Sequence, residues 1–310
     1  MSKNIAWVVG GYGQNGGNYT NNTIAQILQK EFDYEPIMVY EKEEKVTKPS
    51  IFPLEDSYQK MSLKYMFGMV RKHDLIISNP SYSDYFIGLR TPCKKIMYAQ
   101  GFCTFSVLDG FFHHYVSVSD FMKKYLHQVY NLPSEVIPAF VDTNNFPTPK
   151  DFDEKLDRIL VYPKFDSTQF QPIFNNISRK LKEANIPYDL LDKRIKMPQS
   201  DLLDKVNNYK FVMNLSIAEG FGLVPLEAMY LGTIPCGFDG FGGRHFMELD
   251  KNSINVPYPQ INNLFNRVKL HFENKEQARK ISDYAKQTPL KYTKEKFIKS
   301  WTNYLKSILA

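Results

Sequence analysis

Three observations predict an α/β protein made of two doubly wound domains. The chain has 310 residues, which is enough for two domains of about 150 residues each. Short apolar runs alternate with helical stretches along most of the chain, as expected for parallel sheets covered by helices. Glycine-rich turns join a strand to a helix at residues 10–17 and again at 219–222, and turns of this kind are typical of phosphate sites.

The first domain is expected to begin with a strand at 5–9 and a helix at 20–30, followed by a strand at 37–40. Residues 41–60 are polar and contain two prolines, so we expect a mobile loop over the cleft between the domains. Further strands of a doubly wound sheet are expected at 74–78, 95–99 and 115–119.

The turn at residues 10–17 contains the pattern G-x-G-x-x-G, formed by Gly11, Gly13 and Gly16. This pattern, between a strand and a helix, is the fingerprint of dinucleotide binding. Glu41 stands close to the expected position of a ribose-binding acid. An NAD-dependent oxidoreductase is therefore one alternative, although such a short pattern also recurs by chance in glycine-rich loops.

In the second half, the charged, proline-bearing stretch 147–157 is the expected hinge, and 158–162 the next strand. The run 211–215 is expected to form a buried strand, and residues 225–231 a helix that ends at Gly232. Beyond these, we expect a strand at 234–238, a second glycine turn at 240–245, helical structure at 259–287 and a last helix at 294–309.

The strand–turn–helix at 211–231 carries the clearest chemistry. Its turn leaves backbone N–H groups unpaired at the positive end of the helix dipole, which favours a phosphate or diphosphate. Glu219 precedes the turn and Glu227 lies within the helix, so carboxylates can accept hydrogen bonds from hydroxyls on both sides of the anion. A ligand with a diphosphate in the middle and polyols at both ends is a nucleotide-sugar, so the stretch predicts a nucleotide-sugar site.

This stretch resembles the retaining nucleotide-sugar glycosyltransferases of family four, which have the GT-B fold. Their signature matches Glu219, Gly220-Phe221-Gly222, Glu227, Ala228-Met229, Gly232-Thr233 and Pro235. The resemblance implies two Rossmann-like domains facing a cleft, with the final helix crossing back to the first domain. We expect an acceptor-side domain at 1–147, a nucleotide-sugar domain at 148–290, and the returning helix at 291–310.

The resemblance also implies roles for individual residues. Glu219 would accept hydrogen bonds from the sugar hydroxyls, and Glu227 from the ribose. Lys164 would take the place of an arginine that contacts the diphosphate. Glu219 and Lys164 are the expected catalytic residues. Gln100 replaces a histidine found in many members, and the second phosphate-binding lysine is missing. The expected donor-binding residues are Gly16, Gly17, Glu219, Gly220, Phe221, Gly222, Leu223, Glu227 and Arg244.

The predicted function is a metal-independent, retaining hexosyl- or pentosyltransferase with no cofactor, using a UDP- or GDP-linked sugar. The acceptor would be a glycan or lipid-linked glycan, or hydroxymethylated bases in DNA as in phage enzymes. A non-catalytic sugar-binding protein is a further alternative.

Residues 260–310 hold 11 Lys/Arg against 4 Asp/Glu, and this basic region could contact an anionic surface. Three scattered cysteines and an N-terminus that enters a strand at once predict a cytoplasmic protein.

Overall fold

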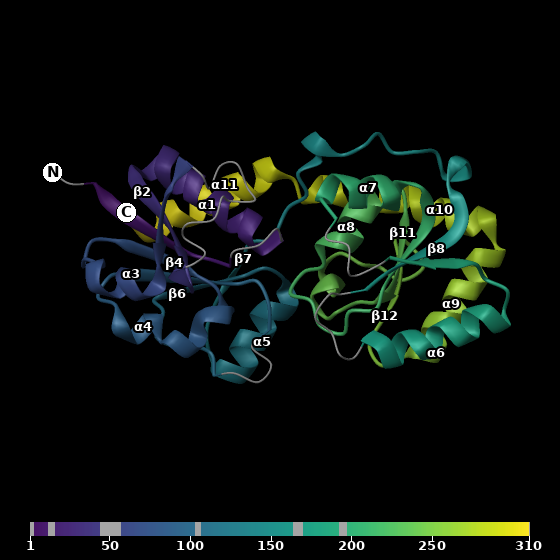
Figure 1. Ribbon diagram of the computed structural model, residues 1–310, viewed down its shortest axis with the longest axis horizontal. Helices are drawn as coiled ribbons and strands as arrows, with labels where there is room; N and C mark the ends of the chain where they lie inside the picture. The colour runs from purple at the N-terminus through teal and green to yellow at the C-terminus, as the bar shows by residue number, and fades with distance from the viewer. Residues whose placement is uncertain are drawn as a thin grey trace. The chain divides into compact units, whose positions relative to one another are not determined.

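The computed structural model describes residues 3–11, 16–43, 57–102, 107–163, 170–191 and 197–309. The chain divides into two compact units (Figure 1). Unit 1 is Met1–Ala139 together with Glu295–Ala310, and unit 2 is Phe140–Lys294. The sequence places these boundaries after residues 147 and 290.

Unit 1 is built on a sheet of seven parallel strands in the order β3-β2-β1-β4-β5-β6-β7. The strand order reverses between β1 and β4, and ligands of such sheets bind at the carboxyl ends of the strands near this point. The strands are β1 (Asn4–Val9), β2 (Tyr34–Tyr40), β3 (Gln59–Ser62), β4 (Leu75–Ser78), β5 (Lys94–Ala99), β6 (His114–Ser117) and β7 (Glu135–Val136).

The edge strand β3 corrects the expectation of a loop over 41–60. Three of its four residues are polar, and they form a strand because β2 offers an open edge to which their backbone can bond. The register pairs Val39 with Met61, and the neighbouring Tyr58 packs with Val8, Ala25 and Met38. Residues 44–56 lie outside the described residues.

In the ranges of unit 1 that the structure describes, five α-helices accompany this sheet. The first of them packs on β1 and β2, and α5 begins where the side-chain oxygen of Ser119 accepts from the backbone N–H of Met122. The helices are α1 (Gly16–Phe32), α3 (Leu63–Met69), α4 (Ile87–Arg90), α5 (Asp120–Tyr130) and α11 (Lys294–Leu309).

The return of the final helix to the first unit is confirmed. Figure 1 shows α11, in yellow, among the purple and blue elements of unit 1. Phe297, Trp301 and Leu305 recur every four residues and are all buried. The ring of Trp301 meets that of Tyr98 on β5 edge-on, with 5.2 Å between centroids. This buried face of α11 therefore belongs to the core of unit 1.

Unit 2 is built on five parallel strands in the order β12-β11-β10-β8-β9. On the central strand, Phe211 and Met213 point to one face and Val212 to the other, as the period of two requires. The strands are β8 (Leu156–Tyr162), β9 (Tyr188–Leu190), β10 (Tyr209–Asn214), β11 (Ile234–Phe238) and β12 (Ile254–Val256).

Helices cover both faces of this second sheet. The larger apolar cluster joins one face to α6 (Phe170–Glu183), α9 (Ile261–Glu273) and α10 (Lys275–Ala285). The smaller cluster joins the other face to α7 (Gln199–Asn207) and α8 (Leu223–Tyr230). No helix in the described ranges combines the length and apolar character that a membrane crossing requires.

Candidate functional site

The strand–turn–helix predicted around the glycine motif is present in unit 2. β10 is buried throughout and ends at Asn214, and α8 begins at Leu223. Gly222 caps this helix in the left-handed region, with φ +98°, where a side chain is strained. The backbone N–H groups of Phe221, Gly222 and Leu223 have no acceptor among the described residues. They form the donor cluster that the sequence predicts at this helix start.

A second loop packs directly against the first. It follows β11 and leads into the short helix η5 (Gly242–His245). The N–H of Glu219 donates to the carbonyl of Gly240 at 2.8 Å, and the N–H of Gly242 donates to the carbonyl of Glu219 at 3.1 Å. These two bonds fix the backbone of Glu219 between the loops.

Glycine is required at the contact between the two loops. A Cβ on Gly242 would lie 2.1 Å from the carbonyl oxygen of Gly220. Gly240 has φ +58°, and its Cβ would lie 2.9 Å from that of Glu219. The two glycine turns expected at 219–222 and 240–245 therefore form one structure.

Glu227 is held behind this structure on α8. Only 8% of the residue is exposed, and the side-chain amide of Gln199, on α7, donates to its Oε1 at 2.6 Å. Burial raises the pKa of Glu227 to about 7, and the Gln199 hydrogen bond opposes that shift. The group can therefore exchange a proton near neutral pH.

Tyr162, at the carboxyl end of β8, lies beside both acids. Burial, together with the charges of Glu227 and Glu219, raises the pKa of Tyr162 to about 12. Its hydroxyl therefore keeps its proton at neutral pH and can donate a hydrogen bond. Sequence reasoning missed Tyr162 and Gln199 because neither lies within the glycine motif.

Arg244 is paired with an acid that sequence reasoning also missed. Its Nε donates to Oδ2 of Asp239 at 2.6 Å, and its guanidinium lies 4.9 Å from the centroid of the Phe241 ring. The other oxygen of Asp239 accepts from the N–H of Phe241 at 2.9 Å. The carboxylate thus ties the arginine to the second loop.

The structure does not bring the other predicted residues that it describes into this site, and two predicted residues are not described. Lys164 and Gly13 are outside the described residues. Gly16 and Gly17 are the first two residues of α1 in unit 1. The carbonyl of Gly17 accepts from the side-chain amide of Gln100 at 3.1 Å.

The geometry of unit 1 gives little support to the interpretation that residues 10–17 bind a dinucleotide. A Cβ on Gly11 would make only ordinary contacts, the nearest at 3.5 Å, so the described structure shows no steric need for glycine there. The carboxylate of Glu41 accepts a hydrogen bond from the hydroxyl of Tyr85 at 2.7 Å.

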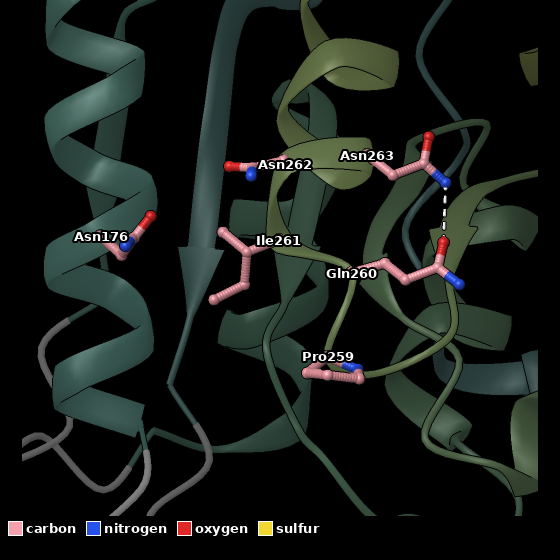
Figure 2. Close-up of a pocket in the computed structure, with 6 residues that line it drawn as sticks. All are labelled: Asn176, Pro259, Gln260, Ile261, Asn262 and Asn263. Atoms are coloured by element: carbon pink, nitrogen blue, oxygen red, sulfur yellow. Dashed lines mark hydrogen bonds between the residues drawn. The ribbon is translucent and has the colours of Figure 1, made fainter.

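Each unit has a pocket outside the two glycine loops of unit 2. The unit 2 pocket, of about 460 Å³, is lined by Asn176 and residues 259–263. Figure 2 shows Asn176 on α6 facing Ile261 and Asn262 at the start of α9. Its lining has no titratable side chain, so we assign it no chemistry. Across the described ranges, no group of three or more His, Cys, Asp or Glu could hold a metal ion.

Comparison with solved structures identifies the fold. A glycosyltransferase from Rickettsia africae matches with a TM-score of 0.73 at 16% identity, covering 100% of this chain and 99% of that one. The fold is GT-B. Sucrose-phosphate synthase from Thermosynechococcus elongatus shares it, with a TM-score of 0.70 at 12% identity and 99% of both chains covered.

A further GT-B structure similar to this chain is HepE from Anabaena, solved in complex with UDP-glucose. It matches with a TM-score of 0.73 at 12% identity, covering 99% of this chain and 100% of that one. Residues 196–288 match the family model described as glycosyl transferases group 1, a segment that contains both glycine loops. A search of curated proteins found no significant match.

Proposed function

We propose that the protein is a retaining glycosyltransferase that moves a sugar from a UDP- or GDP-linked donor to a hydroxyl acceptor. The observation that carries this proposal is the pair of interlocked glycine loops, with Glu219 fixed between them and Glu227 buried behind them. The family-model match over this segment and the GT-B fold support it.

The donor diphosphate would bind at the start of α8. The N–H groups of Phe221, Gly222 and Leu223 can donate to its oxygens, and the helix dipole favours negative charge there. Negative charge grows on the diphosphate as the bond to the sugar breaks, so donors fixed in advance stabilise the transition state more than the ground state. Arg244, oriented by Asp239, and Lys164 would add positive charge.

The two acids would hold the two polyol ends of the donor. Glu227 would accept from the ribose hydroxyls in its deprotonated form, and Tyr162 can donate to an oxygen nearby. Glu219 would accept from sugar hydroxyls close to the reacting carbon. We assign no protein nucleophile; a donor phosphate oxygen would take the acceptor's proton, which accounts for retention without a covalent enzyme intermediate.

We further propose that the enzyme works in the cytoplasm without a divalent metal, and that its acceptor is a glycan or lipid-linked glycan. Seven basic side chains in the C-terminal region lie within ion-pair distance of a carboxylate: Arg267, Lys269, Lys275, Arg279, Lys280, Lys286 and Lys294. This pairing weakens the case for tracking DNA phosphates, which depends on clustered positive charge.

A panel of UDP-, GDP- and ADP-sugars tests the proposal through the release of nucleoside diphosphate. We expect release from one donor class, at the same rate with and without a chelator. In Glu219→Ala, kcat should fall about 100-fold with little change in KM, because the lost contact strengthens as charge develops on the sugar. Loss of release on chelation would contradict metal independence, and failure of the whole panel to bind or react would contradict the proposed activity.

A further inference from the structure

Four aromatic side chains of unit 2 connect the two glycine loops to a segment far along the chain. Phe221 lies in the first loop, His245 and Phe246 lie at the end of η5, and Tyr292 directly follows the short helix η6 (Pro289–Lys291). The ring centroid of Phe221 is 5.1 Å from that of Phe246 and 5.7 Å from that of His245. We call these four side chains the aromatic cluster.

Tyr292 contacts the other three rings of this cluster. Its ring meets that of Phe221 at a steep angle, with 5.4 Å between centroids and 71° between planes. Its centroid lies 5.7 Å from that of His245 and 5.9 Å from that of Phe246. Aromatic pairs with this spacing and tilt attract each other beyond the apolar area that they bury. Tyr292 therefore holds residues of both glycine turns through one ring.

The position of Phe221 bears directly on the candidate diphosphate site. Its backbone N–H is one of the three donors at the start of α8, and its side chain is buried. The Phe246 ring packs beside the next of these donors, since a Cβ on Gly222 would lie 3.9 Å from its Cζ. Protein interiors are close-packed, so a shift of either ring moves the backbone beside it. The aromatic cluster thus helps to set the direction of these N–H groups.

The backbone of Tyr292 lies beside both points at which the chain passes between the units. Unit 2 begins at residue 140 and ends at residue 294. Residues 140–142 and 292–294 therefore adjoin these two points, and we call them the crossing segments.

Three contacts join the crossing segments to each other. The carbonyl of Tyr292 accepts from the N–H of Val141 at 2.9 Å, and Val141 pairs with Thr293 in a parallel β-bridge. Beside them, Nζ of Lys294 donates to Oδ2 of Asp142 at 2.9 Å. The side chains of this ion pair are 23% and 13% exposed, so water screens their attraction less than it would on the open surface.

We propose that Tyr292 is a positioning residue that couples nucleotide binding at the first glycine loop to the crossing segments. The inference rests on the proposed function and adds a residue to that same site. A diphosphate that binds the N–H of Phe221 would restrain the Phe221 ring, and through it the Tyr292 ring. The restraint then reaches Val141, because the backbone of Tyr292 is bonded to it. Coupling between two sites is reciprocal, so loosening the crossing segments should weaken nucleotide binding.

Hydrogen–deuterium exchange on the full chain, with and without saturating UDP or GDP, tests the inference. In the wild type, peptides covering 139–146 and 288–296 should exchange about threefold or more slowly in the complex, in addition to those of the glycine loops. Tyr292→Leu keeps an apolar side chain but is too short to contact all three rings. Its protection should be confined to the glycine loops. Tyr292→Phe keeps the ring and should behave as the wild type does.

Tyr188→Leu is the matched control. Tyr188, on β9, meets the ring of Phe174 edge-on, with 6.0 Å between centroids and 84° between planes. This variant also loses a ring contact within unit 2, but it leaves the aromatic cluster intact. The nucleotide should therefore still protect the crossing segments.

Asp142→Asn tests the coupling from the other end, and it does so even if Tyr292→Leu fails to fold. It removes the ion pair with Lys294 while keeping the shape of the side chain. Calorimetry should show UDP or GDP binding about threefold or more weakly than to the wild type. Unchanged affinity would contradict the reciprocal coupling.

The exchange pattern separates failure of this inference from failure of the proposed function. Protection at 219–231 without any change in the crossing segments of the wild type would overturn the inference and leave glycosyl transfer intact. The same holds if protection still reaches these segments in Tyr292→Leu, or is lost in Tyr292→Phe or Tyr188→Leu. Absence of protection at 219–231 with UDP, GDP and ADP alike would instead count against the proposed function.

Discussion

Replacing Glu227 with glutamine is expected to stabilise the protein near pH 8 by about 3 kcal/mol while weakening nucleotide binding at least tenfold. The stability effect follows from burial, which raises the pKa of this carboxyl from 4.5 to about 7. Between those two values the folded state binds more protons than the unfolded state. Stability therefore falls as pH rises through this window and stays reduced above it.

The two pH profiles should separate the wild type from Glu227→Gln. Glutamine does not ionise, and its oxygen can still accept from Gln199, so the variant should match the wild type near pH 4.5 and exceed it near pH 8. UDP or GDP binding to the wild type should strengthen from pH 6 to pH 8, because only the carboxylate accepts from both ribose hydroxyls. The variant should lose that dependence.

Denaturant unfolding and calorimetry across this pH range measure both effects. The second phosphate ionisation of the nucleotide is common to both proteins, so the difference between them isolates Glu227. A variant less stable than the wild type at pH 8 would show that the carboxylate is well compensated in the fold. Unchanged nucleotide affinity would show that Glu227 does not contact the ligand.

Gly242→Ala is expected to abolish measurable nucleotide binding and to cost about 2 kcal/mol of folding stability. The added Cβ would lie 2.1 Å from the carbonyl oxygen of Gly220 and 2.4 Å from that of Glu219. Both contacts are with backbone, so the loops must move apart. Their separation would break the bonds that fix Glu219 and shift the N–H groups at the start of α8.

Gly110→Ala controls for the loss of glycine itself, because a Cβ added there would have no atom within 4 Å and the φ of Gly110 is not positive. Its stability and affinity should remain within about 0.5 kcal/mol of the wild type. Calorimetry with UDP and GDP, alongside thermal unfolding, compares the variants. If Gly242→Ala folds and binds as the wild type does, the contact between the loops is not what organises the site.

The strand–turn–helix could be predicted from sequence because its signals are local. A glycine at φ +98° before α8 and the apolar run 211–213 within β10 are properties of neighbouring residues. The spacing of Phe297, Trp301 and Leu305 in α11 is likewise a local pattern, typical of a helix with one buried face. The edge strand β3 was missed because its pairing with β2, rather than its own polar composition, makes it a strand.

The parts of the site that sequence did not predict depend on long-range packing. Gln199 and Glu227 are 28 residues apart and meet only because α7 and α8 share one face of the sheet. Tyr162 approaches both acids because β8 and β10 are neighbours in the sheet. The predicted Arg244 was correctly placed in the second glycine turn, but its pairing with Asp239 depends on how that turn folds.

Hydrogen–deuterium exchange measured with and without saturating UDP or GDP tests the central claim most directly. If the two glycine loops of unit 2 bind the diphosphate, amides in peptides covering 219–231 and 239–246 should exchange at least tenfold more slowly in the complex. Those of α1 in unit 1 should show less protection. Protection confined to 8–24, with no change at 219–231, would contradict the account and place the nucleotide at the N-terminal glycine turn.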